Sequence, residues 1–184
     1  GKLTTIDRHG STEEIPNSTL NADLTLNEWA QARLQDKADF YYLQDESCRV
    51  LELYLAEEGV GLAETWPTGN GRVLKVEFFV EWATDVTQGI PAGTYKVVAR
   101  DEESKGILRE FLKPGGIASG YPNVFTYPAG TWYEKISNGT MKEYARIDAG
   151  TMTVVRDGDK HTLTIDFIDC DKAHPHHVRS TFSQ

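Results

Sequence analysis

The sequence TMTVVRDGDKHTLTIDFID at Thr151–Asp169 carries the clearest signal for the fold of this chain. Leu163, Ile165 and Phe167 alternate with polar residues, which is the period of a strand that buries one of its faces. A short turn at residues 157–159, with Gly between two Asp residues, joins this run to an earlier apolar segment. Two extended segments that flank such a turn predict a β-hairpin.

A related device recurs three times along the chain, as PAGTY at Pro91–Tyr95, PAGTW at Pro128–Trp132 and AGTM at Ala149–Met152. Gly, with Pro in two copies, favours a turn, and the residues that follow favour extended backbone. We therefore expect a strand to begin at each copy. The copies start at residues 92, 129 and 149, and this uneven spacing is not that of a solenoid or propeller with one fixed period.

Other segments extend the same pattern. Apolar residues alternate with polar ones at Leu51–Leu55 and again at Leu74–Val80, and the Asn-Gly pair in SNGT at Ser137–Thr140 favours a type I′ hairpin turn. Glu28–Gln35 is ambiguous, with a weak preference for a strand. About eight to ten short strands and no convincing helix predict an all-β fold, either an antiparallel β-sandwich or jelly roll or a closed β-barrel. The sequence does not choose between these.

Length and composition set the domain organisation. The chain has 184 residues, which suits one domain, and we expect a polar N-terminal arm or tether at residues 1–27 and a single β domain at residues 28–184. The formal charge of -9, with scattered basic residues, disfavours nucleic acid as a partner. No apolar run approaches the length of a membrane-spanning helix, so we expect a soluble chain with no transmembrane segment.

The order of these motifs resembles a known family. The succession IPAGTY, YPAGTWY and DAGTMTVVRDGDKHTLTIDFID, followed by a short terminal strand, is similar to surface lipoprotein domains of gut bacteria, some of which are described as lipid-binding. The resemblance covers about Ala38 to Phe182. It implies an all-β domain outside the cytoplasm, secreted or held at the surface by a lipid anchor upstream of this chain, with no known catalytic residues. The chain departs from the family pattern at DCDKAHPHH, where such domains often carry Gly.

That tract is also the best candidate for metal chemistry. Five potential ligands lie within nine residues: Asp169, Asp171, His174, His176 and His177. The set lacks four ligands at a known zinc spacing, and it lacks the ligand pattern and Gly of a calcium loop. We therefore predict a polar loop between the last two strands, without bound metal, and we expect no cofactor.

Reactive side chains give weaker signals. Ser119 in GGIASG lies one position from a nucleophile elbow and does not follow a clear strand, so we interpret this segment as a flexible loop. Cys48 precedes one predicted strand and Cys170 follows another. A disulfide between them and two free thiols are both consistent with the sequence.

Aromatic residues in the Gly- and Pro-rich connections are the candidate binding residues. They are Trp66, Tyr121, Phe125, Tyr127, Trp132 and Tyr133. Loops at the ends of a β scaffold often carry binding sites, and aromatic rings contact apolar molecules and sugars alike. The sequence therefore predicts a non-enzymatic domain that binds a lipid or another apolar small molecule. The alternatives are a carbohydrate-binding module or a glycoside hydrolase whose carboxylates converge only in three dimensions.

Overall fold

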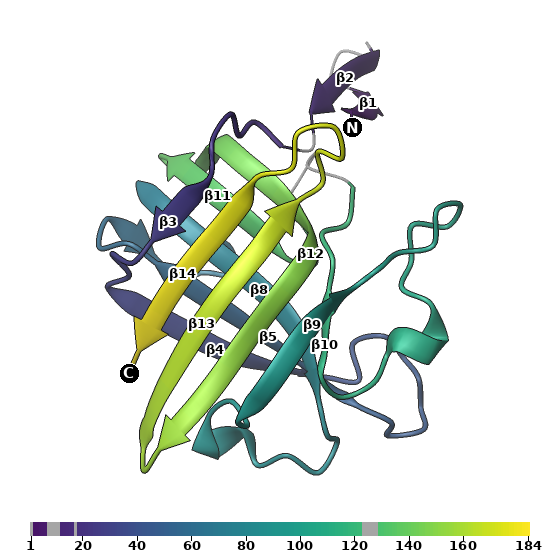
Figure 1. The fold of residues 1–184 in the computed structure, drawn as a ribbon, viewed down its shortest axis with the longest axis vertical. Coiled ribbons are helices and arrows are strands. Elements are labelled where there is room, and N and C mark those ends of the chain that lie inside the picture. The colour runs from purple at the N-terminus through teal and green to yellow at the C-terminus, as the bar shows by residue number, and fades with distance from the viewer. Residues whose placement is uncertain (1, 7–11, 17, 123–128) are drawn as a thin grey trace.

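The computed structural model describes residues 2–6, 12–16, 18–122 and 129–184, and its regular structure is almost entirely β-strand (Figure 1). The strands are, in chain order, β1 Lys2–Ile6, β2 Thr12–Pro16, β3 Leu24–Leu26, β4 Gln31–Ala38, β5 Arg49–Ala56, β6 Val60–Gly61, β7 Thr68–Gly69, β8 Gly71–Val80, β9 Gly93–Val98, β10 Gly116–Ala118, β11 Trp132–Ser137, β12 Thr140–Asp157, β13 Lys160–Asp169 and β14 His177–Ser183. Two single-turn 3₁₀ helices, η1 Val86–Gln88 and η2 Arg109–Phe111, lie in connections. The all-β prediction is confirmed.

Five of the strands close into a barrel. One edge of β8 pairs with β11 and β10, both β11 and β9 pair with β12, and parallel pairing of β9 with β10 completes the ring. Closure matters because it supplies backbone hydrogen-bond partners at both edges of each strand. Of the predicted sandwich, jelly roll and barrel, the structure therefore has the closed barrel, with further strands added to it.

Two sets of strands continue outward from this barrel. The first wing consists of β5 and β4, which extend from the second edge of β8, and the second wing consists of β13, β14 and β3, which extend from β12. Figure 1 shows β12, β13 and β14 crossing in front of β4, β5 and β8. The 10-stranded sheet thus runs from β3 to β4, and its two wings face each other across the interior.

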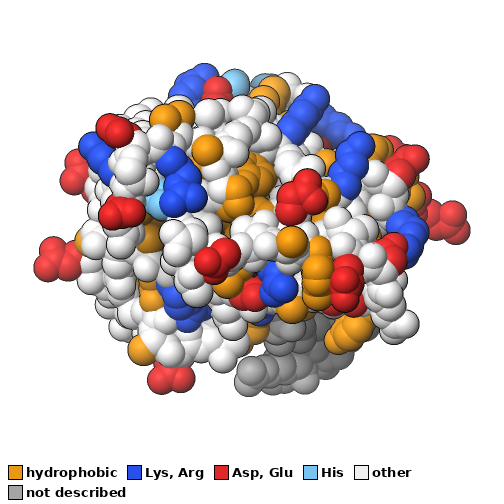
Figure 2. Space-filling view, turned by 90° about the horizontal axis from the view of Figure 1, so that it is seen from below, with side chains coloured by type: hydrophobic (Ala, Val, Ile, Leu, Met, Phe, Trp, Pro, Cys, Tyr) orange, Lys and Arg blue, Asp and Glu red, His pale blue; other side chains and the backbone are white. Residues whose placement is uncertain are grey.

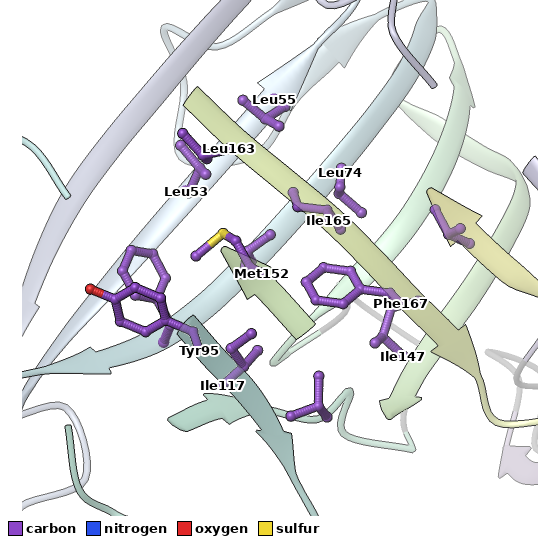
Figure 3. Close-up of a cluster of buried hydrophobic side chains, with 14 of the residues drawn as sticks. Leu53, Leu55, Leu74, Tyr95, Ile117, Ile147, Met152, Leu163, Ile165 and Phe167 are labelled. Carbon is purple, nitrogen blue, oxygen red and sulfur yellow. The ribbon is translucent and has the colours of Figure 1, made fainter. Parts of the chain in front are cut away.

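Alternating apolar side chains fill the space between the two layers. Leu74, Val76 and Phe78 of β8 belong to the main core cluster, as their alternation predicts. Leu53 of β5 and Leu163 of β13 belong to the same cluster, and Figure 3 shows their side chains next to each other. Burying one such side chain contributes about 1.5–3 kcal/mol. The cluster therefore holds both wings against the barrel.

The prediction that a strand begins at the AGTM motif is wrong. Residues 149–152 do not begin a strand; they lie inside β12, where the pairing register shifts between Ile147 and Ala149. Gly150 has φ 112, and a Cβ at this position would lie 2.2 Å from the backbone oxygen of Asp166. The glycine is needed here because β13 approaches the backbone too closely for any side chain. The first part of β12 can then pair with β11 and the second part with β9.

Other local predictions have mixed outcomes. The hairpin within Thr151–Asp169 is formed by β12 and β13, and the ambiguous segment is a strand, β4. Asn138 and Gly139 have φ 50 and φ 74, as a type I′ turn requires. The GGIASG segment is not a flexible loop, because Gly116–Ala118 form β10 and are buried in the barrel.

The expected N-terminal arm is partly integrated into the fold. β3 pairs in parallel with β14, and Leu26 is buried in the main core cluster. The Thr19 amide donates to the Tyr144 backbone oxygen at 2.8 Å, and the His177 amide donates to the Asp23 carboxylate at 2.8 Å. From Ser18 onward this segment is therefore attached to the main sheet rather than being a loose tether. β1 and β2 pair antiparallel in a separate two-stranded sheet.

The bend in β12 gives a stability prediction. Gly150→Ala should lower the free energy of unfolding by roughly 3 kcal/mol or more, because the methyl group meets backbone in addition to straining a positive φ. Gly158→Ala is the matched control, since Gly158 has φ 60 but nothing within 4 Å of a Cβ, and should cost about 1–2 kcal/mol. Urea denaturation measures both, and equal losses would contradict the proposed role of Gly150.

Candidate functional site

The six predicted aromatic residues do not share one environment. Trp66 lies in the connection between β6 and β7 with 40% of its surface exposed, and Tyr121 is half-buried. The guanidinium of Arg100 lies 5.3 Å from the centre of the Tyr121 ring, so that ring already has a cation–π partner. Phe125 and Tyr127 lie outside the described residues. The four side chains that the structure describes therefore do not form one platform.

Trp132 and Tyr133 are misplaced in the sequence prediction. They begin β11, a strand of the closed barrel, and both are fully buried. Trp132 donates from Nε1 to the Ala129 backbone oxygen at 2.8 Å, and Tyr133 donates from its hydroxyl to Glu143 at 2.6 Å. Both rings thus serve packing and internal hydrogen bonding, and neither presents a surface to a ligand in this conformation.

A cavity of about 460 Å³ opens between the two wings, at the end of the molecule where β12 turns into β13. Its apolar residues come from both wings and from the segment after η1: Ala32, Leu34, Leu53, Ile90, Leu163 and Phe182. Figure 2 looks at this end and shows hydrophobic side chains in the middle of the face, bordered by side chains of both charges. The cavity exists because the outer edge of β4 pairs with no strand among the described residues.

Polar residues surround the apolar part of this cavity. They are Thr87 and Gln88 of η1, Arg156, Asp159 and His161 of the β12–β13 hairpin, and Gln184. Arg156 and His161 are directly opposite each other in the hairpin register, so their side chains lie on the same face. The site thus combines an apolar interior with a polar rim that carries one Arg and one Asp.

The η1 segment packs closely on this rim. Gly89 has φ 81, and a Cβ there would lie 3.0 Å from both Cε1 and Nε2 of His161. His161 Nδ1 lies 3.2 Å from the Asp159 backbone oxygen, and its Nε2 is buried without a hydrogen-bond partner among the described residues. The absence of a side chain at Gly89 therefore lets η1 approach the hairpin and form one side of the cavity.

The outer face of the first wing and barrel carries a buried charged belt, which we define as Glu52, Lys75, Glu77 and Glu134. Lys75 Nζ lies 3.8 Å from Glu52, and Tyr41 donates its hydroxyl to Glu77 at 2.5 Å. Burial raises the pKa of the Glu134 carboxyl to about 7, and the positive charge of Lys75 opposes that rise. Carboxylates with different environments can form an acid–base pair, but the burial of all four side chains keeps substrate away from them.

The histidine tract forms carboxylate–imidazole pairs. His176 Nδ1 lies 3.0 Å from the buried carboxylate of Asp169, and His177 Nδ1 lies 2.6 Å from Asp166. Asp169 also accepts hydrogen bonds from the Ser18 hydroxyl at 2.7 Å and from the His176 amide at 2.9 Å. In the part of the chain that the structure describes, no three His, Cys, Asp or Glu side chains are grouped to hold a metal ion. The hydrogen bonds of this tract thus attach the segment that begins at Ser18 to β13 and β14.

The remaining reactive candidates are buried. Cys48 and Cys170 are both free, which resolves the alternative that the sequence left open. Burial raises the pKa of both thiols, so they are poor nucleophiles. Ser119 is buried and its hydroxyl has no hydrogen-bond partner among the described residues, so no base activates it.

Glu134 gives a prediction about pH. Its carboxyl, with an ordinary value of 4.5, keeps its proton in the folded state up to about pH 7, whereas the unfolded chain releases it earlier. The folded state then binds more protons, so this residue makes the free energy of unfolding fall as the pH rises from about 4.5 to about 7. Glu134→Gln should remove that fall, worth a few kcal/mol. Urea denaturation at several pH values measures it, with Glu58→Gln in an exposed turn as the control; an unchanged pH dependence in Glu134→Gln would contradict the assignment.

Asp169 gives a second prediction. Asp169→Ala should lower the free energy of unfolding by roughly 3 kcal/mol, because it leaves the Ser18 hydroxyl and the His176 donors without their buried acceptor. Asp166→Ala is the control: its carboxylate also pairs with a histidine but is about half exposed, so the loss should stay below about 1 kcal/mol. Calorimetric melting compares the two, and similar losses would refute a special role for Asp169.

Comparisons with known proteins add no relative to this picture. Neither the protein-family models, nor the curated proteins, nor the solved structures include a match to this chain. The resemblance to surface lipoprotein domains accordingly stays a hypothesis from the sequence. Within the described residues, no helix is both long and apolar enough to cross a lipid bilayer.

Proposed function

We propose that this chain is a non-enzymatic binding domain of a secreted or surface-anchored protein, and that it holds an apolar small molecule in the cavity between its two wings. The observation that carries the proposal is the cavity itself, about 460 Å³ in volume and lined by side chains of the main core. Ligand pockets commonly have volumes of about 300–1,000 Å³ and predominantly apolar linings.

The chemistry of the interior favours an apolar ligand. Leu53 and Leu163 are buried core residues, and both also line the cavity. Water in contact with such side chains is readily displaced, and each methylene group that a ligand buries contributes about 0.8 kcal/mol. A chain of several methylene groups therefore gains enough free energy to bind measurably, even after the entropy cost of association.

A glycan is less well supported as the ligand. Sugar-binding sites use Trp and Tyr rings as platforms, and the residues that line this cavity include neither. Of the predicted aromatic platform, Trp132 and Tyr133 are fully buried. The carbohydrate alternative thus lacks the aromatic surface on which it depends.

A hydrolase is also less well supported. Two carboxylate residues of the sheet, Glu52 of β5 and Glu77 of β8, are directly paired, and both are buried. A glycoside hydrolase needs two carboxyl groups that flank an open cleft, where a sugar chain and water can reach them. The charged belt does not offer such access, which supports a binding role over catalysis.

The proposal predicts that filling the cavity abolishes binding. Ala32 lines the cavity from β4, and Ala32→Phe should occupy its interior and weaken the binding of 1-decanol and of a neutral naphthylamine fluorophore at least tenfold. Fluorescence enhancement and its displacement by decanol measure the change.

Ala30→Phe is the matched control. Ala30 is exposed, lies two residues before Ala32 and does not line the cavity, so the same substitution there should leave affinity unchanged. Both variants should keep one cooperative melt. If wild-type protein binds neither probe, or if Ala32→Phe binds as well as Ala30→Phe, the cavity is not the binding site.

A further inference from the structure

Arg156 differs from the other arginines of the described chain in its hydrogen bonding. Most arginines elsewhere form side-chain hydrogen bonds or ion pairs with carboxylates or backbone oxygens, as the contacts of Arg33, Arg49, Arg100, Arg109, Arg146 and Arg179 show. The exception is Arg72, whose side chain interacts with the Tyr133 side chain. The Arg156 guanidinium makes no hydrogen bond or ion pair with any described residue, although Arg156 lines the cavity. A guanidinium carries five N–H donors in a planar fork that matches an anionic group such as carboxylate or phosphate.

The position of Arg156 indicates which end of a ligand its guanidinium would contact. It lies near the end of β12, at the rim, and Leu163 of the paired strand β13 lies in the apolar interior of the same cavity. A ligand that enters between the wings would thus pass from charged surroundings into apolar surroundings. This order suits a molecule with a charged end and an alkyl tail.

One acidic side chain at the rim acts against an anion. Asp159 lies in the turn of the hairpin and lines the cavity, but it forms no ion pair with Arg156 among the described contacts. The side chains of the remaining rim residues outside the hairpin, Thr87, Gln88 and Gln184, are uncharged. The Thr87 hydroxyl donates to Asp85 at 2.6 Å, whereas the two glutamine amides can donate to a ligand. Because Asp159 and Arg156 form no ion pair with each other, substitution of each one tests its own effect on a charged ligand.

From these observations we infer that the ligand is a single-chain amphiphile with an anionic head group, which the Arg156 guanidinium binds while the alkyl tail occupies the apolar interior. The inference rests on the proposed function, since it specifies the ligand class of the same cavity. A volume of about 460 Å³ suits one alkyl chain of moderate length rather than a two-chain lipid. Carboxylate and phosphate heads share the required chemistry.

The test compares three probes that have the same tail: decanoate, decyl phosphate and 1-decanol. Calorimetric titration below their micelle concentrations should show that wild-type protein binds at least one anion roughly three- to tenfold more tightly than decanol. Arg156→Gln should remove this preference without changing decanol affinity. Asp159→Asn should strengthen anion binding, again without effect on decanol, because it removes a nearby like charge.

Lys160→Gln is the charge-matched control. Lys160 belongs to the same hairpin but does not line the cavity, so its loss should leave the preference in place. Preference for decanoate alone or decyl phosphate alone identifies the head group and supports the inference. If all three probes bind equally and Arg156→Gln changes none of them, the inference is wrong while the proposed function stands. If no probe binds, the proposed function fails and the inference fails with it.

Discussion

Hydrogen bonding along both edges of β8 is the constraint on which the rest of the structure depends. One edge pairs with β5 over the whole length of that strand, and the other edge pairs with β11 and then with β10. The backbone of β8 is thereby held by hydrogen bonds on both sides. Because successive side chains of a strand point to opposite faces, its pleat determines which side chains enter the core. Leu74, Val76 and Phe78 enter the core, while Lys75 and Glu77 are placed on the outer face, where they are also buried.

The cavity follows from how the wings attach to this barrel. Strands inside the ring have partners on both edges, but the wings end in β4 on one side and in β14 with β3 on the other. The two ends approach each other through side chains rather than through a backbone ladder: Trp29 donates from Nε1 to the Ser180 hydroxyl at 2.5 Å. Further along, where Ala32 and Phe182 line the cavity, the structure shows no such contact among the residues it describes, and the cavity remains open.

Local patterns in the sequence were sufficient to predict the strands but not their long-range surroundings. Alternation at Leu51–Leu55, Leu74–Val80 and Leu163–Phe167 predicted β5, β8 and β13, because alternation of side chains is a local property of the sequence. That the second face of β5 and β8 is also buried depends on distant parts of the chain and was not predicted. The role of Gly150 could not be predicted in this way, since it depends on the Asp166 backbone of the next strand.

The candidate site depended even more on the long-range arrangement of strands. Trp132 and Tyr133 looked like loop residues beside Gly and Pro, yet β11 lies between β8 and β12, which buries both rings. Arg156 and His161 belong to a hairpin that was predicted, but the cavity they line is completed by β4 and β5, more than 100 residues earlier.

The central claim is that a ligand's apolar part lies between the wings. Methyl-labelled nuclear magnetic resonance of the protein with protonated 1-decanol tests this most directly, because intermolecular Overhauser effects report which methyl groups touch the ligand. We predict such effects at Leu34, Leu53 and Leu163, which line the cavity, and none at Val60 or Ile136, which form a separate buried cluster. Effects at Val60 and Ile136, with none at the cavity residues, would contradict this account.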